Sequence, residues 1–247
     1  QLESLQDNVP PIDKDVVRLM VRPHISSNVF TFFDYEPFKS ASIGQVHRAS
    51  LSTGEEVIVK IKRPNIYNIM KNDTDNIRQI VEFLEQVGID TGTNTGYVLD
   101  ESIEYLLAES DYNKEISNAI KFRKALKKVK WIKVPKVYDE LCTENMVVME
   151  YVHSEKLMEI TDPMVNKKKV CEALLNSYVI QTMDKGFFHA DPHPGNLGFS
   201  GNGKLVFYDF GLVIDISDEM KEGFKEMFLH IINKDTKGIV DVLIKLK

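Results

Sequence analysis

The sequence predicts a two-lobed α+β fold, with a strand-rich half that carries inserted helices followed by a mainly helical half. Residues 42–64 show the alternating apolar pattern and central turn of a β-hairpin. Residues 65–87 and 165–185 place apolar side chains at steps of three and four, as amphipathic helices do. A short apolar segment between these patterns divides the chain into a first lobe over 1–148, a connector over 149–156 and a second lobe over 157–247.

The composition is that of a folded globular protein. The chain has 247 residues, 43% apolar and 28% charged, which is enough for one large domain or two small lobes. Its formal net charge of -6 gives no electrostatic reason to expect nucleic acid as a partner. Cys142 and Cys171 form neither a metal-binding pattern nor a disulfide framework. No apolar run approaches the ~20 residues that span a bilayer, so no transmembrane segment is expected in this chain.

The first half reads as strands with helices inserted among them. Residues 30–38 favour a strand that ends at a turn around Pro37, and the hairpin 42–64 turns at "STGE" and stops at Pro64. The elements expected next are a helix over 65–87, a loop over 90–96, a single helix over 99–126, and two strands within 132–152.

The second half is expected to be mainly helical. The helix over 165–185 should end at Gly186, a residue type common just past helix ends. Two apolar runs around "SGNG" predict a further hairpin over 197–210. The last 30 residues have a helical pattern.

Lys60 is the first candidate functional residue, because it stands mid-strand in "VIVKIK". One interpretation is a lysine on the wet face of an edge strand. The other is an ammonium that contacts phosphate oxygens and is held by a helix carboxylate. The second interpretation needs further phosphate-binding residues elsewhere in the chain.

Such residues follow in "FHADPHPGN" and "YDFG". Asp191 and Asn196 form a D-x-x-x-x-N spacing, and Asp209 comes later. An aspartate that orients or deprotonates the acceptor, an amide oxygen for a metal and a second metal-binding aspartate are the parts that phosphoryl transfer needs. Each motif alone is weak, but the ordered set of strand lysine, HxDxxxxN and DFG is specific.

The connector and the loop before Lys60 supply candidate nucleotide contacts. In protein kinases a strand such as "VVMEYV" ends in a gatekeeper followed by backbone groups that bind adenine, here Met149, the Glu150 carbonyl and the Val152 amide. A buried strand end is the alternative. The phosphate loop would be "KSASIGQVH", which has one glycine and should be stiffer than a glycine-rich loop. Its candidate contacts are Ala41, Ser42, Ile43, Gly44 and Val46.

These stretches, together with "SASIGQVHRA", "VIVKIKRP" and "ESDYNKE", resemble the ABC1/UbiB (ADCK, COQ8-like) family of atypical kinases over nearly the whole chain. The resemblance implies a protein kinase-like fold with an alanine-rich loop in place of the glycine-rich one. Lys39 and Ser40 stand where the first two alanines would be. Glu109 and Asp111 match the E-x-D motif of the family, and Glu115 is the expected ion-pair partner of Lys60.

The geometry of a helix bears on these acids. In one regular helix, Glu109 and Glu115 would lie about 120° apart, so both could not face one lysine. Asp111 and Glu115, four residues apart, could share a face.

The resemblance also implies the chemistry and its setting. Lys60 would contact the α- and β-phosphates of ATP or ADP, Asn196 and Asp209 would hold Mg²⁺, and Asp191 would act on the acceptor. Similar proteins support prenylquinone (ubiquinone-type) biosynthesis or homeostasis at mitochondrial, plastid or bacterial membranes, with lipid intermediates and quinone-biosynthesis proteins as partners. The N-terminal K-x-G-Q motif of the family does not occur and the second lobe stops early, so a fragment of a longer protein is expected.

Three other interpretations stay open. A small-molecule kinase of the aminoglycoside or choline type shares H-x-D-x-H-x-x-N but lacks "SIGQVH" and the E-x-D segment. A pseudokinase could bind nucleotide and act through partners without catalysis. A zinc site could use His189, Asp191 and His193, although the neighbouring prolines constrain that backbone. In the kinase interpretation His189 braces the loop, and Ala190 replaces the arginine that reads activation-loop phosphorylation in protein kinases.

Overall fold

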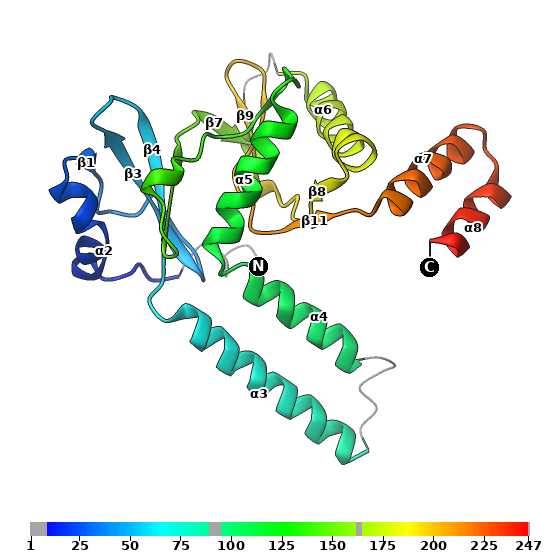
Figure 1. Cartoon of the computed structure of the whole chain (residues 1–247), viewed down its shortest axis with the longest axis horizontal. Coiled ribbons are helices and arrows are strands. Elements are labelled where there is room, and N and C mark those ends of the chain that lie inside the picture. The colour runs from blue at the N-terminus through cyan, green and yellow to red at the C-terminus, as the bar shows by residue number, and fades with distance from the viewer. Residues whose placement is uncertain (1–8, 89–94, 162–164, 247) are drawn as a thin grey trace. The chain divides into compact units, whose positions relative to one another are not determined.

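The structure, a computed structural model, describes residues 9–88, 95–161 and 165–246. The chain divides into two units, which are residues 1–120 with 135–151 and residues 121–134 with 152–247. Each unit combines strands with helices, so the predicted α+β class is confirmed (Figure 1). The opening residues and most of the loop expected over 90–96 lie outside the described residues.

A five-stranded antiparallel sheet forms the centre of the first unit. Its strands are β1 (Phe30–Phe33), β2 (Lys39–Ser40), β3 (Gly44–Leu51), β4 (Glu56–Lys62) and β6 (Met146–Glu150). The predicted hairpin is β3 with β4, and β6 pairs with the other edge of β4. Val57, Val59 and Ile61 are buried on one face of β4. Because side chains alternate along a strand, Ile58 and Lys60 emerge on the other face.

Helix α2 (Lys14–Ser26) covers the apolar face of this sheet. Asp13 caps the helix by accepting the Asp15 N–H at 2.7 Å. Val17 and Val21, one turn apart, are fully buried in a core that includes Phe30 and Val59. The amphipathic pattern of "VVRLMV" is therefore a packing signal for this unit.

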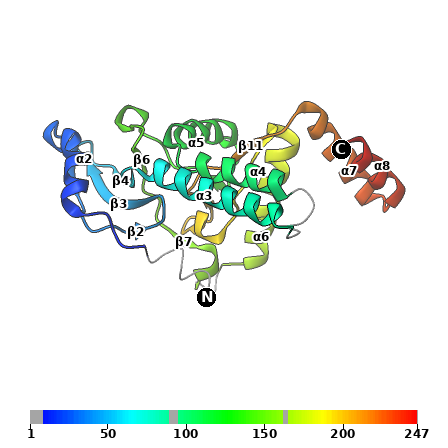
Figure 2. The same ribbon diagram turned by 90° about the horizontal axis from the view of Figure 1, so that it is seen from below.

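Two helices form an insertion between β4 and the rest of the first unit. α3 (Ile66–Gln86) and α4 (Thr95–Ala108) run side by side in Figures 1 and 2, and the Arg78 guanidinium joins Asp100 at 2.7 Å. The prediction of one helix over 99–126 is wrong. The chain leaves the helix at Glu109 and starts α5 (Tyr112–Leu126), because the Asp111 side chain accepts backbone N–H groups that a continuous helix would bond internally.

The second unit has a four-stranded sheet and a separate strand pair. The sheet runs β5 (Ile132–Lys133), β10 (Leu205–Phe207), β9 (Leu197–Ser200), β7 (Ser154–Lys156), and the pair is β8 (Phe187–His189) with β11 (Val213–Asp215). The hairpin predicted over 197–210 is β9 with β10. Phe122 is fully buried at the core, with its ring centroid 4.9 Å from that of Phe187 and 5.3 Å from that of Phe210.

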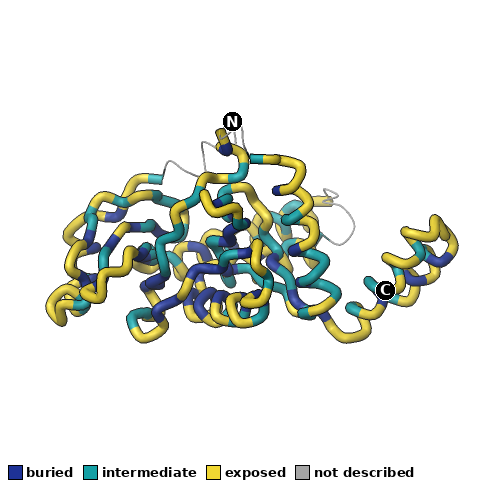
Figure 3. The backbone as a smooth tube through the Cα atoms, turned by 90° about the horizontal axis from the view of Figure 1, so that it is seen from above, coloured by how far each residue is buried: buried dark blue, intermediate teal, exposed yellow. Residues whose placement is uncertain are grey.

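The helix predicted over 165–185 has two parts. α6 (Lys167–Val179) continues as a π-helical stretch, Ile180–Lys185, which ends at Gly186 with a φ of 70°. α7 (Asp218–Ile232) and α8 (Thr236–Lys245) supply the helical end of the chain and are largely exposed (Figure 3). Short 3₁₀ turns occur at Asp139–Leu141, Leu157–Glu159 and Pro194–Asn196. Among the described residues, no helix is both long and apolar enough to cross a membrane.

Candidate active site

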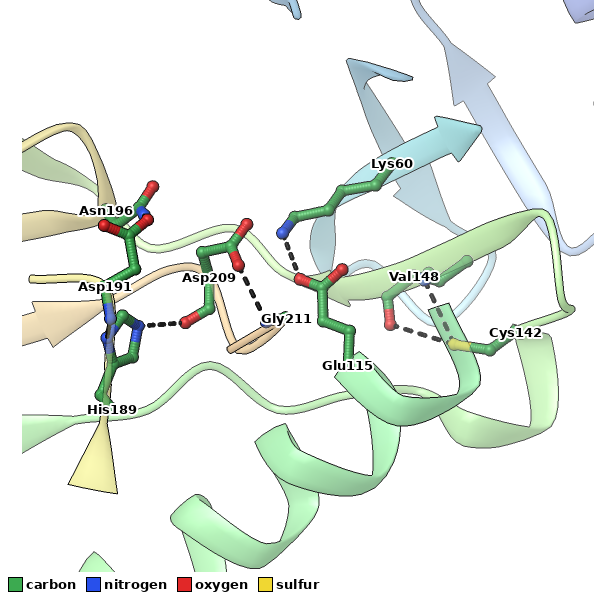
Figure 4. Close-up of polar contacts among 9 residues, drawn as sticks. All are labelled: Lys60, Glu115, Cys142, Val148, His189, Asp191, Asn196, Asp209 and Gly211. Atoms are coloured by element: carbon green, nitrogen blue, oxygen red, sulfur yellow. Dashed lines mark hydrogen bonds and ion pairs between the residues drawn. The ribbon is translucent and has the colours of Figure 1, made fainter. Parts of the chain in front are cut away.

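Lys60 forms an ion pair with Glu115 inside the first unit. Its Nζ donates to Glu115 Oε1, and only 12% of the Lys60 side chain and 5% of the Glu115 side chain are exposed (Figure 4). A lysine on the wet face of an edge strand would be exposed, and β4 is not an edge strand because it pairs with both β3 and β6. The ammonium is therefore held at one position by a carboxylate from α5.

The start of α5 determines where Glu115 stands. The Asp111 carboxylate accepts the N–H of Asn113 at 3.0 Å and of Lys114 at 3.3 Å, and the Asp111 carbonyl accepts the N–H of Glu115 at 3.1 Å. Asp111 is thus a capping residue outside the helix. Asp111 and Glu115 therefore do not belong to one regular helix, which the argument from their four-residue spacing assumed. Glu109 lies in the turn before the cap, with its N–H donated to the Tyr105 carbonyl at 3.2 Å.

The loop between β2 and β3 holds most of the predicted phosphate contacts. The Ala41 N–H donates to the Gly44 carbonyl at 2.9 Å, and the Ile43 carbonyl accepts the Arg63 N–H at 2.8 Å. Gly44 has no positive φ, but a Cβ added there would lie 2.5 Å from the Ile61 carbonyl oxygen. Glycine is therefore required at this position by the close approach of two backbones, and not by a left-handed conformation.

Val46 and Lys60 are direct partners across β3 and β4. Directly opposed residues of an antiparallel pair project from the same face, so Val46 stands beside the lysine on the face that the buried residues of β4 do not use.

The end of β6 carries the predicted adenine contacts of the first unit. Met149 is fully buried and pairs with Ile58. The strand remains tied to its neighbours beyond that point, since the Glu150 N–H donates to the Lys136 carbonyl at 2.8 Å and the Tyr151 N–H donates to the Glu56 carbonyl at 3.0 Å. Val152 belongs to the second unit, where its carbonyl accepts the Ser154 hydroxyl at 2.9 Å.

In the second unit, one imidazole joins the two aspartates of the predicted motifs. His189 Nε2 donates to the Asp209 carbonyl at 2.6 Å, and His189 Nδ1 accepts the Asp191 N–H at 3.2 Å. The Asn196 amide donates to Asp191 Oδ2 at 2.6 Å. Asp191, Asn196 and Asp209 extend to the same side of the ring (Figure 4). His189 therefore fixes the backbone of both motifs relative to each other.

The two hydrogen bonds of the His189 ring require the neutral imidazole, because Nε2 donates a proton and Nδ1 accepts one. Its ring is 1% exposed, and burial lowers the pKa of His189 although its bond to the Asp209 carbonyl opposes that shift. With both nitrogens engaged by backbone groups, His189 cannot ligate zinc without breaking the loop. His193 Nδ1 accepts the Gly195 N–H at 3.1 Å. In the described part of the chain, no three His, Cys, Asp or Glu side chains group as a metal site.

Two further residues that the sequence did not single out support His189. The Tyr178 hydroxyl donates to the His189 carbonyl at 3.0 Å, and Gln181 Oε1 accepts the His189 N–H at 2.9 Å. Burial and the charge of Asp191 raise the pKa of Tyr178 to about 12. Both residues lie on the helix predicted over 165–185, where fully buried Gln181 is a polar residue at a core position. The sequence could have indicated Gln181, because it is a polar residue on a helix face that is otherwise buried.

The Asp209 carboxylate is oriented by its own loop. Its Oδ1 accepts the Gly211 N–H at 2.9 Å, which orients the side chain, and the following Phe210 is fully buried against Phe122. Carboxylate and amide oxygens are the ligands that Mg²⁺ prefers, and it commonly binds through one or two carboxylates plus substrate phosphates. Asp209 and Asn196 fit this requirement.

Comparison with known proteins assigns most of the chain to a family of atypical kinases. The model of the ABC1 atypical kinase-like domain matches residues 4–243. The chain is 37% identical to the Arabidopsis thaliana protein Activity of bc1 complex kinase 8, chloroplastic, over all of this chain and 34% of that protein. It is also 34% identical to an uncharacterized Clostridium pasteurianum protein, over all of this chain and 47% of that one. The chain thus spans between a third and a half of these relatives.

Solved structures share the fold. The Rv3197–erythromycin complex from Mycobacterium tuberculosis matches with a TM-score of 0.74 and 26% identity, over 96% of this chain and 61% of that one. The Rio2 kinase–ADP/Mg²⁺–phosphoaspartate complex from Chaetomium thermophilum matches with a TM-score of 0.50 and 15% identity, over 91% and 59%. These likenesses confirm the kinase-like architecture, and with the family match they lead to one conclusion: the chain belongs to the ABC1 atypical kinase-like family.

Proposed function

We propose that this chain is a catalytic region that binds ATP or ADP with Mg²⁺ and transfers the terminal phosphoryl group to an acceptor or to water. The observation that carries the proposal is the bridge formed by His189 between Asp191 and Asp209. Phosphoryl transfer depends mainly on positioning and charge stabilisation, so a fixed spacing between the acceptor-facing and the metal-facing aspartate is what the reaction requires.

Each residue has a role in this proposal. Lys60, oriented by Glu115, contacts the α- and β-phosphates. Asn196 and Asp209 hold Mg²⁺, which neutralises phosphate charge when bound. Asp191 orients or deprotonates the acceptor, and its bond to the Asn196 amide holds its carboxylate in place. The loop at residues 41–44 covers the phosphates, and Met149, the Glu150 carbonyl and the Val152 amide border the adenine.

Support for the nucleotide and the metal comes from the fold. The structure of Rio2 kinase that shares the fold contains ADP and Mg²⁺. The loop of this chain has one glycine where a glycine-rich loop has several, so ATP and ADP are both candidate ligands. A role in prenylquinone biosynthesis or homeostasis, with lipid and protein partners at a plastid or bacterial membrane, rests on the family resemblance and on the chloroplastic and bacterial relatives.

The proposal is tested by nucleotide binding and hydrolysis, each with and without Mg²⁺, on the wild-type chain and two variants. Asp209→Asn should remove the Mg²⁺-dependent part of binding. Asp191→Asn should leave binding within a few-fold and lower turnover by about 10²–10⁴-fold, the usual contribution of a positioned acid or base. Equal Mg²⁺-dependent affinity for wild type and Asp209→Asn would refute the metal assignment. Binding with no turnover in the wild type would favour a nucleotide-binding pseudokinase.

A further inference from the structure

Arg63 holds the loop between β2 and β3 through hydrogen bonds from both its side chain and its backbone. Its Nε donates to the Ala41 carbonyl at 3.0 Å, and its Nη2 donates to the Ser40 hydroxyl at 2.9 Å. Its backbone N–H donates to the Ile43 carbonyl at 2.8 Å. One residue, three positions after Lys60, therefore bonds three of the residues that lie between Lys39 and Gly44.

The same guanidinium joins the loop to the beginning of the described chain. Arg63 Nη2 also donates to the Pro10 carbonyl at 2.7 Å. Two residues later, the Ile12 N–H donates to Gln45 Oε1 at 2.7 Å, just past the other end of the loop. The segment Pro10–Ile12 is thus bonded on both sides of the loop, once through Arg63 and once through Gln45.

The Gln45 end of this arrangement is rigid. Gln45 is 1% exposed and His47 is fully buried. The Gln45 amide donates to His47 Nε2 at 2.8 Å, and His47 Nδ1 donates to the Asp34 carbonyl at 2.8 Å. The His47 ring also stacks on Phe33 at 5.1 Å. Because buried polar groups cannot change partners without cost, this end of the loop has one arrangement.

The chemistry of these contacts needs arginine. Three of the acceptors lie around one guanidinium, and a planar fork of five donors serves several acceptors at once. A lysine ammonium at the same position would keep the charge but reach fewer of them. No residue from Lys39 to Gly44 has a positive φ, so the loop keeps its shape through external bonds and not through glycine conformations.

We propose that Arg63 is a positioning residue for the phosphate loop, which sets nucleotide affinity by fixing the backbone of residues 40–43 and tying it to the segment Pro10–Ile12. The affinity part of this inference rests on the proposed nucleotide-binding function. The loop-fixing part does not, because it concerns the protein without ligand.

Amide hydrogen exchange and nucleotide titration test the two parts separately on the full chain. Arg63→Gln and Arg63→Lys are compared with Arg18→Gln, which removes an exposed arginine whose ion-pair partner is Asp15 on the same helix. In the absence of ligand, both Arg63 variants should speed exchange of residues 40–44 about tenfold, because the loop loses hydrogen bonds to a charged group. A tenfold change corresponds to about 1.4 kcal/mol. The dissociation constant for ADP with Mg²⁺ should rise about tenfold in both.

The outcomes separate the alternatives. Failure of Arg63→Lys to restore either value would support the need for the guanidinium. Wild-type exchange of residues 40–44 in both Arg63 variants would overturn the proposal. So would faster exchange across the whole sheet with a lower midpoint of thermal unfolding, since Arg63 would then be a general stabiliser. Absence of nucleotide binding by the wild type would refute the proposed function, while the ligand-free exchange would still decide the role of Arg63 in the loop.

Discussion

The backbone of Glu115 donates to the carbonyl of Asp111 at 3.1 Å, so the residue that binds Lys60 is positioned by the residue that caps its helix. Asp111 thereby has a structural role as well as its place in the E-x-D motif. The two roles predict different behaviour for different substitutions.

Asp111→Ala should lower the free energy of unfolding by about 1 kcal/mol, the usual cost of losing a helix N-cap. Asp111→Ser should keep most of that stability, because a serine hydroxyl accepts the same N–H groups. Urea unfolding measures the difference. If Asp111→Ser is stable and also keeps nucleotide hydrolysis, the carboxylate acts only as a cap. If it is stable and inactive, the charge has a further role at the site.

The buried ion pair should show strong coupling. Glu115→Ala should destabilise the chain by about 3–5 kcal/mol, because it leaves the Lys60 ammonium buried without its carboxylate. The double variant Lys60→Met with Glu115→Leu should be less destabilised than Glu115→Ala alone, since it removes both charges. Chemical denaturation of Lys60→Met, Glu115→Leu and the double variant, which form one cycle, measures the coupling. Additive effects would mean that the pair contributes little.

Stability should decline on mild acidification. Burial lowers the pKa of both His47 and His189 below the ordinary value of 6.5. The unfolded chain therefore binds more protons than the folded chain once the pH falls below about 6.5, and stability present above that pH is lost as the pH falls toward the folded-state pKa values. The free energy of unfolding measured between pH 8 and 5 should show this slope, and His47→Gln should reduce it. A matched substitution at exposed His153 is the control.

Gly96 should tolerate replacement by alanine, and Gly44 should not. Gly44→Ala places a Cβ 2.5 Å from the Ile61 carbonyl oxygen, so the strands must shift, at a cost of about 1–3 kcal/mol. Gly96, in α4, has nothing within 4 Å of an added Cβ. Gly96→Ala should therefore stabilise the chain by up to about 1 kcal/mol through helix propensity. Thermal unfolding of the pair tests this contrast, which would fail if both variants shifted the midpoint equally.

The two thiols should differ in reactivity. Burial raises the pKa of Cys142 to about 11, and its Sγ accepts the Val148 N–H at 3.2 Å (Figure 4). The same Sγ donates to the Tyr138 carbonyl at 3.3 Å. Cys171 is exposed on α6. Because the thiolate is the reactive form, a thiol reagent should modify one cysteine rapidly in the native chain and two after unfolding. Cys171→Ser should abolish the rapid phase, and rapid labelling that persists in this variant would contradict the burial of Cys142.

Strands and helices with a clear apolar period were predictable from the sequence, as the β3–β4 hairpin and α3 show. The very short strands β8 and β11 were not, because three residues carry no period and their pairing depends on segments far apart in the chain. The break before α5 was missed because the apolar pattern continues through it, while a single side chain, that of Asp111, caps the start of the new helix.

Site residues that belong to a sequence motif were predictable. Site residues whose role depends only on tertiary packing were not. Lys60, Asp191, Asn196 and Asp209 stand in recognisable spacings. The contacts of Arg63 with the loop could not be read from the sequence, since they depend on the register of β2 against β3 and on the path of the N-terminal segment.

The loop that carries Asp191 depends on the number of residues in the π-helical stretch Ile180–Lys185. A wide turn holds one residue more than the ordinary α-helical turn, and here the buried Gln181 within it reaches the N–H of His189. Deleting a single residue between Gln181 and Gly186 would close the wide turn and shorten the connection from Gln181 to His189 by one residue. A change of one codon, with no change in any motif, would then take the amide of residue 181 away from the loop that carries Asp191.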